Sequence, residues 1–403
     1  MTTLPIAVPA AELSRSTVRD LVRHLRAALD GTGPAVVPVA APADDGGVPA
    51  VPTDVALGIR TSGSTGTPRT VLLGRDALRA SATATHERLG GPGRWLLSLP
   101  VVHVAGVQVL VRSLLAGTDP VLLGGRFDAA AWAAAAAAAR TGPERLYGSL
   151  VPTQLHRVVA AARADAAVRD DVARARLDAV LLGGAAAPAG LLADAAELGL
   201  RVVRTYGMSE TAGGCVYDGV PLDGVRVRLV DGVVEIAGPV LSHGYLVRDD
   251  ARDGGGGDRA LDTSAFRLDD GERWFVTQDL GETDDDGRLR VLGRRDDMIV
   301  TGGVNVAPAA VESVLSTLVT GGVGVVGVPD DEWGRAVVAV LTPAAGDVDL
   351  AALREHVRRS LGAAAAPRHV VVVDRLPEKG PGKVDRVALE RHAATVLGRG
   401  RGR

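Results

Sequence analysis

The sequence predicts an α/β protein with a large multi-layer N-terminal domain and a small α/β C-terminal domain. The 403 residues exceed what one compact core of ordinary size holds. Short apolar runs alternate with helix-like stretches rich in Ala, Leu and Arg, a pattern typical of α/β layers. After the charged segment that begins at Arg294, the pattern of predicted helices and strands changes again. We therefore expect one domain over residues 1–293 and a second over residues 294–403.

The expected strands of the large domain cover 36–39, 95–99, 120–123, 179–182, 201–203 and 225–230. The Ala-rich run 129–139 predicts a surface helix, because Ala has the highest helix propensity and Trp132 supplies an apolar anchor. Strand-like segments at 233–237, 274–276 and 289–292 predict a β-rich region. The Gly-rich, acidic stretch 248–262 inside that region predicts a mobile loop.

The small domain is expected to contain a helix at 308–318, strands at 323–328 and 336–341, a helix at 350–361 and a strand at 369–373. Its boundary with the large domain falls in the charged segment that begins at Arg294. No internal repeat is visible in the chain.

Composition excludes several classes of function. A formal net charge of -3 provides no overall field that would attract nucleic acid. The apolar runs are too short to span a membrane, and the N-terminus lacks the basic start of a secretory signal, so we expect a cytoplasmic protein. Cys215 is the only cysteine, and a single thiol makes neither an internal disulfide nor a metal cluster. We interpret it as an inert, buried thiol.

The first segment that carries chemistry is a loop of small hydroxyl residues and glycines. It comprises Thr61, Ser62, Gly63, Ser64, Thr65 and Gly66. Such a loop wraps its backbone amides and hydroxyls closely around phosphate. It is not a Walker loop, because no Gly-Lys-Ser/Thr follows. A flexible linker is the alternative, but a linker is seldom flanked by apolar, strand-like runs.

The second segment follows the strand expected at 201–203. It runs through Tyr206, Gly207, Met208, Ser209 and Glu210. An aromatic ring, a tight glycine and a carboxylate at the end of a strand can stack a base and hold Mg²⁺ beside phosphates. The alternative is a loop in which Glu210 caps a helix and Tyr206 is part of the core.

The last two segments supply charged groups. Asp279 can accept two hydrogen bonds from a ribose diol, and Arg294 can reinforce that contact, unless both are solvated turn residues. Lys383 lies in a Gly-rich loop, and Lys379 is the only other lysine in the chain. The Lys383 ammonium is suited to stabilise negative charge between a carboxylate and a phosphate; a solvated loop is the alternative.

Together these segments, in this order, resemble the adenylate-forming superfamily of acyl-CoA synthetases, adenylation domains and luciferases. The resemblance extends from Thr61 to Arg386. It implies an ATP-dependent, AMP-forming acid–thiol ligase that uses Mg²⁺ and coenzyme A. The small domain would then be a mobile lid over the large one.

The resemblance also implies a role for each matching residue. The loop from Thr61 to Gly66 would cradle pyrophosphate, and Glu210 would associate with Mg²⁺. Asp279 and Arg294 would bind ribose, Asp296 would be the hinge, and Lys383 would catalyse adenylation. The walls of the adenine site would be Gly183, Gly184, Ala185, Thr205, Tyr206 and Gly207.

In the second half of the reaction, Gly302 and Gly303 would move to the opening through which the thiol enters. Two positions depart from the family pattern. Arg69 replaces the Lys frequent in the phosphate loop, and Gln278 replaces the Gly usual before the ribose-binding acid. Gln278 is therefore expected to affect the affinity for ATP.

A narrower resemblance, to the actinobacterial 2-succinylbenzoate–CoA ligases of menaquinone biosynthesis, comes from segments 99–106, 149–156 and 181–188. It places His103 beside the acyl group and the thiol path, and Gly207 against the acid substrate. Arg112 lies in an apolar, helix-like run after His103 and can pair with the second carboxylate of the acid. The alternatives are a core histidine and an arginine that snorkels to solvent.

Other functions stay open at this point. A ligase for another aryl or acyl acid, or a stand-alone enzyme that loads a carrier protein, would carry the same motifs. A nucleotide-binding pseudoenzyme is a more distant alternative, because Lys383, Glu210 and Asp279 are all retained. Small molecules are the expected partners, without nucleic acid or membrane, and a homodimer is possible.

Overall fold

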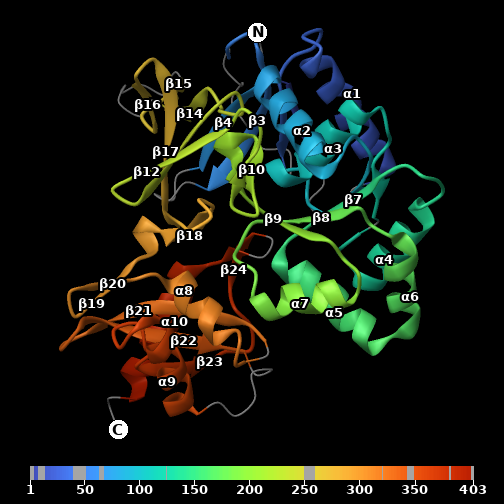
Figure 1. Ribbon diagram of the computed structural model, residues 1–403. Coiled ribbons are helices and arrows are strands. Elements are labelled where there is room, and N and C mark those ends of the chain that lie inside the picture. The colour runs from blue at the N-terminus through green and yellow to red at the C-terminus, as the bar shows by residue number, and fades with distance from the viewer. Residues whose placement is uncertain are drawn as a thin grey trace.

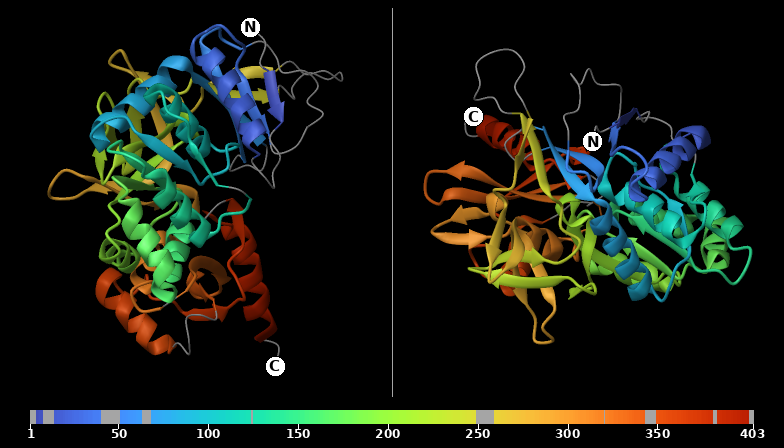
Figure 2. Two further views of the ribbon diagram at one scale, coloured as in Figure 1. Left: turned by 90° about the vertical axis from the view of Figure 1, so that its right-hand side faces the viewer. Right: turned by 90° about the horizontal axis from the view of Figure 1, so that it is seen from above.

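The protein was analysed as a computed structural model. The structure describes residues 4–7, 14–39, 51–62, 68–123, 125–248, 259–319, 321–342, 349–380 and 383–400. A large part, up to Arg294, and a smaller part, after residue 298, form two groups of elements (Figure 1). The smaller part also lies below the large part in the left view of Figure 2, in which the molecule is turned about the vertical axis.

Three sheets build the large part. The first has the order β1 (Leu4–Ala7), β2 (Val36–Val39), β3 (Val55–Ser62), β4 (Pro68–Gly74), β14 (Gly244–Arg248) and β15 (Arg259–Asp262). The second has the order β11 (Val220–Pro221), β10 (Gly213–Tyr217), β9 (Val202–Met208), β8 (Ala179–Leu182), β7 (Leu146–Leu150), β5 (Arg94–Leu97) and β6 (Val121–Leu122). Within it, β5 to β9 are parallel and β10 is antiparallel to β9.

The third sheet has the order β12 (Arg226–Val230), β13 (Val233–Ala237), β17 (Glu272–Thr283) and β16 (Phe266–Asp269), with β18 (Leu289–Arg294) paired to β17. All of its strand pairs are antiparallel. The β-rich region expected from the sequence is therefore confirmed.

Alternating side chains of the second sheet point into two cores. Trp95, Tyr147 and Leu181 face a core shared with α1 (Arg15–Leu29), α2 (Arg75–Leu89), α3 (Val104–Ala116) and the other two sheets. Leu96 and Val180 face a second core. Its helices are α4 (Ala129–Ala139), α5 (Pro152–Ala164), α6 (Ala166–Ala175) and α7 (Ala189–Glu197). This period of two is the pattern of a sheet covered on both faces.

The Ala-rich helix forms over the predicted residues. Asp128 caps α4, its side chain accepting from the backbone of Ala131, and Trp132 is fully buried. The prediction for 248–262 was wrong at its end, because Arg259–Asp262 pairs with β14 as a strand. Residues 249–258 lie outside the described part of the chain.

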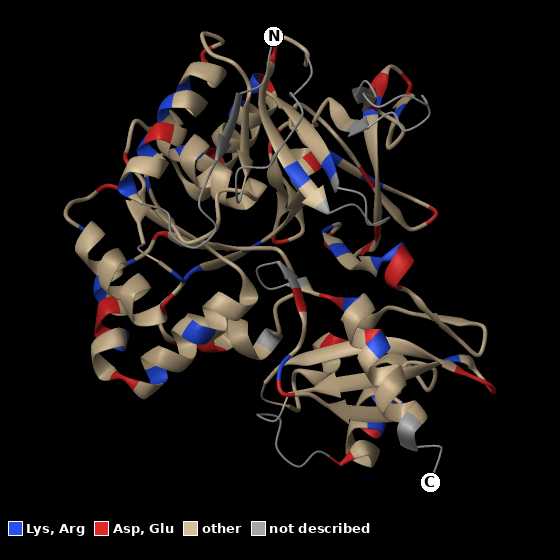
Figure 3. Cartoon of the chain, turned by 180° about the vertical axis from the view of Figure 1, so that it is seen from behind, with Lys and Arg blue, Asp and Glu red and all other residues tan. Residues whose placement is uncertain are grey.

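The small part begins with β19 (Ile299–Thr301), β20 (Val304–Val306) and α8 (Pro308–Leu315). Its sheet consists of β21 (Val323–Asp330), β22 (Gly334–Leu341) and β23 (His369–Val372). α8 and α9 (Leu350–Leu361) cover one face and α10 (Arg386–Gly400) covers the other. The β24 (Glu378–Gly380) and β25 (Lys383–Val384) hairpin projects toward the large part (Figures 1 and 3). The helix expected at 308–318 ends earlier, at Leu315.

Charge is spread over the surface. Figure 3 shows the molecule from behind, with Lys and Arg (blue) and Asp and Glu (red) interspersed over its elements. None of the described helices is both long and apolar enough to cross a membrane.

Candidate active site

A cavity of about 790 Å³ opens where the three large sheets meet. Its walls come from β3 and β4, from α2 and α3, from the ends of β8, β9 and β10, and from β14, β17 and β18. Residues as distant in sequence as Ile59 and Arg294 line it. A pocket of this size holds a ligand of nucleotide dimensions or larger.

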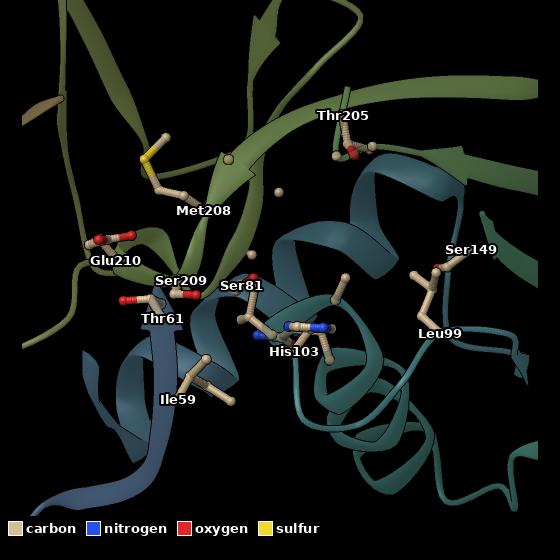
Figure 4. Close-up of a pocket in the computed structure, with 18 of the residues that line it drawn as sticks. Ile59, Thr61, Ser81, Leu99, His103, Ser149, Thr205, Met208, Ser209 and Glu210 are labelled. Atoms are coloured by element: carbon tan, nitrogen blue, oxygen red, sulfur yellow. The ribbon is translucent and has the colours of Figure 1, made fainter. Parts of the chain in front are cut away.

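Most of the residues singled out in the sequence lie in this wall. They are Thr61, His103, Arg112, Gly183, Gly184, Thr205, Gly207, Met208, Ser209, Glu210, Asp279 and Arg294. Figure 4 shows Thr61 and Glu210 together on one side, with His103 projecting from the start of α3 between them and Ser149.

Other predicted residues lie elsewhere. Ala185 is exposed and does not line the cavity. Gly302 and Gly303 form the turn between β19 and β20, where the Gly302 amide donates to the Trp333 carbonyl. Lys383 begins β25 in the hairpin that projects toward the large part. Ser62 ends β3, while Gly63, Ser64, Thr65 and Gly66 lie outside the described residues.

Asp279 and Arg294 are direct cross-strand partners in the β17–β18 pair. The Tyr206 hydroxyl donates to Asp279 Oδ2 over 2.6 Å. Burial, followed by the Asp279 charge, raises the pKa of Tyr206 well above its usual value, so the phenol remains a donor. Arg294 donates from Nε and Nη2 to both oxygens of Asp296, each over 2.7 Å. Gln278 also lines the cavity, and its Oε1 accepts from Arg295 Nη2 over 3.1 Å.

Glu210 lies in a short 3-10 turn, Ser209–Thr211, directly after β9. The Tyr245 hydroxyl donates to Glu210 Oε1 over 2.8 Å. Burial raises the pKa of the Glu210 carboxyl. The Arg69 guanidinium lies 5.4 Å from the centroid of the Tyr245 ring. The cavity therefore contains a partly desolvated carboxylate, Glu210, that the Tyr245 hydroxyl holds by a hydrogen bond.

His103 occupies the cap position before α3. Its ring makes no hydrogen bond within the part of the chain that the structure describes. Partial desolvation in the cavity wall lowers the pKa of His103, which keeps the imidazole neutral at neutral pH. A satisfied core histidine does not fit an exposed side chain that has no hydrogen-bond partner among the described residues. The binding role of His103 stays a prediction.

Arg112 lies at the deep end of the cavity. It is 5% exposed, so it does not snorkel to solvent. Its Nε donates to the Gln108 carbonyl over 3.0 Å, and its Nη2 contacts Ser149 Oγ at 3.4 Å. Burial lowers the pKa of Arg112 to about 10, which leaves it charged at neutral pH. Among the described residues no carboxylate pairs with it.

Two glycines keep the wall of the cavity thin. A Cβ at Gly207 would collide with the carbonyl oxygen of Gly213 on β10. A Cβ at Gly183 would lie 2.6 Å from Thr205 Oγ1. Gly207 requires glycine because the backbone of β10 approaches so closely, whereas at Gly183 the close neighbour is a side chain.

Several lining residues were missed in the sequence. Around the deep end these are Ser81, Thr85, Gln108, Ser149 and Tyr217, and near Glu210 it is Tyr245. One signal was available, because the chain has only four tyrosines. Three of these, Tyr206, Tyr217 and Tyr245, line the cavity or bond to its carboxylates.

Family comparison agrees with the resemblance of the sequence. Residues 9–247 match the AMP-binding enzyme family, and residues 311–383 match the AMP-binding enzyme C-terminal domain. A Mycobacterium tuberculosis protein named "Probable 2-succinylbenzoate–CoA ligase" is 46% identical over 85% of this chain and 85% of its own length. The 2-succinylbenzoate–CoA ligase of Bacillus licheniformis is 32% identical over 83% of this chain and 70% of its own length.

Solved structures give the same picture. The o-succinylbenzoate CoA synthetase (MenE) of Bacillus subtilis, in complex with the acyl-adenylate intermediate OSB-AMP, has a TM-score of 0.67 at 26% identity. The match covers 92% of this chain and 81% of that one. Wild-type E. coli MenE with a bound analogue of OSB-AMS has a TM-score of 0.65 at 26% identity, covering 98% of this chain and 89% of that one.

Proposed function

The chain belongs to the AMP-binding enzyme family, and we propose that it joins 2-succinylbenzoate to coenzyme A through an acyl-adenylate, with ATP cleaved to AMP and pyrophosphate. It is an AMP-forming acid–thiol ligase. Its place is in menaquinone biosynthesis, the pathway in which this thioester is formed. The similarity to named ligases and to the MenE structures supports this assignment.

One observation carries the choice of acid. Arg112 is charged and buried at the deep end of the cavity, and no carboxylate of the described residues pairs with it. A buried charge without a counter-ion is costly, so a ligand that brings an anion there is favoured. 2-Succinylbenzoate has a second carboxylate that stays ionised while the aliphatic one reacts. A monocarboxylic acid would leave Arg112 unpaired.

Other residues of the cavity wall suit ATP. We assign the pyrophosphate to the loop from Thr61 to Gly66, and the adenine to Gly183, Gly184 and the β9 segment from Thr205 to Gly207. Ala185 is proposed to close the adenine site only when nucleotide is bound, since it is exposed here. Asp279 and Arg294 lie on paired strands and are assigned to the ribose hydroxyls.

Magnesium fits the carboxylate of Glu210. Mg²⁺ binds through one or two carboxylates and the phosphates of its nucleotide, and among the described residues no cluster of three metal-ligating side chains exists to select another ion. Bound there, it would neutralise phosphate charge. Tyr245 holds one oxygen of Glu210 in place through its 2.8 Å hydrogen bond.

In the first half of the reaction, an oxygen of the aliphatic carboxylate attacks the α-phosphorus and pyrophosphate leaves. Lys383 is proposed to stabilise the charge that develops between the two groups. The projection of the β24–β25 hairpin toward the large part supports this role. His103, neutral and in the wall of the cavity, adds no charge beside the reacting carboxylate.

In the second half, the thiol sulfur attacks the acyl carbonyl carbon and AMP leaves. We propose that residues 294–403 turn about Asp296, removing Lys383 and bringing Gly302 and Gly303 to the thiol entrance. Their place in the β19–β20 turn, away from the cavity lining, is consistent with a separate state for thiol transfer.

The remaining alternatives can be distinguished by their reaction with free coenzyme A. An enzyme that loads a carrier protein would react poorly with free coenzyme A, whereas a ligase for another acid would use it. A pseudoenzyme would bind ATP without turnover. We also propose that the protein is cytoplasmic, with a homodimer as the assembly to test by size-exclusion chromatography with light scattering.

A panel of acids tests the proposal. The purified protein is incubated with ATP, Mg²⁺ and coenzyme A, together with 2-succinylbenzoate, benzoate, medium-chain fatty acids or amino acids. Thioester, AMP and pyrophosphate are measured. We expect turnover of 2-succinylbenzoate far above the other acids. Preference for another acid would overturn the assignment of 2-succinylbenzoate as the substrate. If none of the acids were turned over, the assignment as a ligase would be overturned.

A further inference from the structure

The guanidinium of Arg112 has an aromatic ring where a buried arginine usually has a carboxylate. Its Cζ lies 3.9 Å from the centroid of the Trp95 ring. Its other contacts include the neutral oxygens of Gln108 and Ser149. A tryptophan face attracts a cation through its quadrupole without neutralising the charge.

Trp95 is held firmly in this position. Its ring is fully buried on β5, and the ring of Tyr147 on the neighbouring strand packs against it with centroids 4.7 Å apart. The indole Nε1 donates to His86 Nε2 over 3.4 Å. His86 lies on α2 and is itself buried. Neither Trp95 nor His86 lines the cavity, so neither touches a ligand in it, and Trp95 contacts the lining residue Arg112.

Tyr217 adds a second neutral group on this side. Its hydroxyl interacts electrostatically with the Arg112 guanidinium and lies 2.9 Å from the hydroxyl of Thr85. Arg112 is thus surrounded by a ring face, two hydroxyls and a carbonyl. Each of these groups tolerates a cation, and none competes as an anion with a ligand for it.

We propose that Trp95 is a positioning residue that sets the preference for an acid with a second anionic group, and that His86 fixes its ring. The ring keeps Arg112 charged, extended and without a counter-ion, ready for a carboxylate in the cavity. This inference rests on the proposed function, since it explains how the same cavity selects a dicarboxylic acid.

The test compares two acids that differ in one carboxylate. The first is 2-succinylbenzoate and the second is 4-oxo-4-phenylbutanoate, which lacks the carboxylate on the ring. Steady-state kcat/KM is measured for both with the wild type and with Trp95→Leu, Trp95→Phe, His86→Leu and His86→Gln. Phenylalanine retains an aromatic face, and glutamine retains an acceptor for the indole N–H.

We expect Trp95→Leu to lower kcat/KM for the diacid about 5- to 30-fold, mostly through KM, the loss that follows from removing a desolvated cation–π contact. The value for the monoacid stays close to that of the wild type. Trp95→Phe restores part of the selectivity. His86→Leu lowers the ratio of kcat/KM for the diacid to kcat/KM for the monoacid, and His86→Gln keeps this ratio close to that of the wild type.

Equal losses for both acids would overturn the inference, because they would show a merely structural role for Trp95. If Trp95→Leu does not fold, the two His86 variants decide: the inference fails if both show the wild-type ratio of diacid to monoacid. Failure of the proposed function has a different signature, since the wild type itself would then not prefer the diacid.

Discussion

The hydroxyl of Tyr206 on β9 donates to Oδ2 of Asp279 on β17, over 2.6 Å. This bond connects the seven-stranded sheet to the five-stranded sheet at the edge of the cavity. It joins a residue assigned to the adenine wall with one assigned to the ribose. The two parts of the proposed nucleotide site therefore have a fixed separation.

Tyr206→Phe should raise KM for ATP about 10-fold, because a hydrogen bond to a charged group contributes about 1.5 kcal/mol. KM for the acid should change little. Tyr147→Phe is the matched control, since its hydroxyl bonds to backbone carbonyls of residues 89 and 91 outside the cavity. An unchanged KM for ATP in Tyr206→Phe would remove this residue from the nucleotide site.

Arg112→Ala should lower kcat/KM for 2-succinylbenzoate by about 10²-fold or more, the loss typical of a charge-assisted contact in a desolvated site. Activity with a monocarboxylic acid should fall much less, because that acid has no second carboxylate to pair. The measurement is the ratio of the two values by thioester formation. If neither affinity for the diacid nor preference over benzoate changed, Arg112 would not bind the second carboxylate.

Lys383→Ala should abolish adenylation and spare thiol transfer from supplied acyl-adenylate. Its ammonium is needed only where charge develops at the α-phosphate. Lys379→Ala, the same change at the only other lysine of the chain, should retain both half-reactions. Pyrophosphate release and thioester formation from the adenylate are measured separately. Equal loss of both half-reactions would contradict this division of labour.

The lowered pKa of His86 predicts that the folded protein loses stability in acid. Burial, and then the Arg112 charge, lower the pKa of His86 from 6.5 to about 4. The unfolded chain takes up this proton as pH falls below 6.5, whereas the folded chain resists it until about pH 4. The free energy of unfolding should therefore fall by about 3 kcal/mol across that window. Urea titrations of the wild type and His86→Gln measure the difference, and parallel pH profiles would contradict it.

Gly207→Ala should destabilise the contact between β9 and β10 by about 1–3 kcal/mol, because the added Cβ collides with the Gly213 carbonyl. It should also weaken ATP binding. Gly190→Ala in α7 is the control, since its added Cβ meets no atom within 4 Å. Calorimetry of both variants tests this, and two equal melting temperatures would show that β10 moves aside without cost.

Local signals explain which elements could be predicted. The helices α4 and α9 form over the expected residues because each combines good helix formers with an aspartate cap, Asp128 and Asp349. The strand expected at 201–203 was too short. In the structure it continues to Met208, because residues 205–208 pair with β10 across a turn that propensity does not reveal.

In the site too, local motifs could be predicted and long-range contacts could not. Residues in distinctive local motifs, such as Glu210 and Asp279, were found and do line the cavity. Tyr245 and Trp95 were not, because their contacts with Glu210 and Arg112 join separate sheets and helices. Nothing near either residue in the sequence indicates these long-range contacts. Arg112 was found, but its lack of a counter-ion depends on the folded surroundings.

The central claim is that this cavity forms an adenylate of 2-succinylbenzoate. The most direct measurement is exchange of labelled pyrophosphate into ATP, without coenzyme A, with the wild-type protein and Mg²⁺. We predict exchange that depends on 2-succinylbenzoate and is absent with benzoate. No exchange with 2-succinylbenzoate, or equal exchange with every acid, would contradict the account.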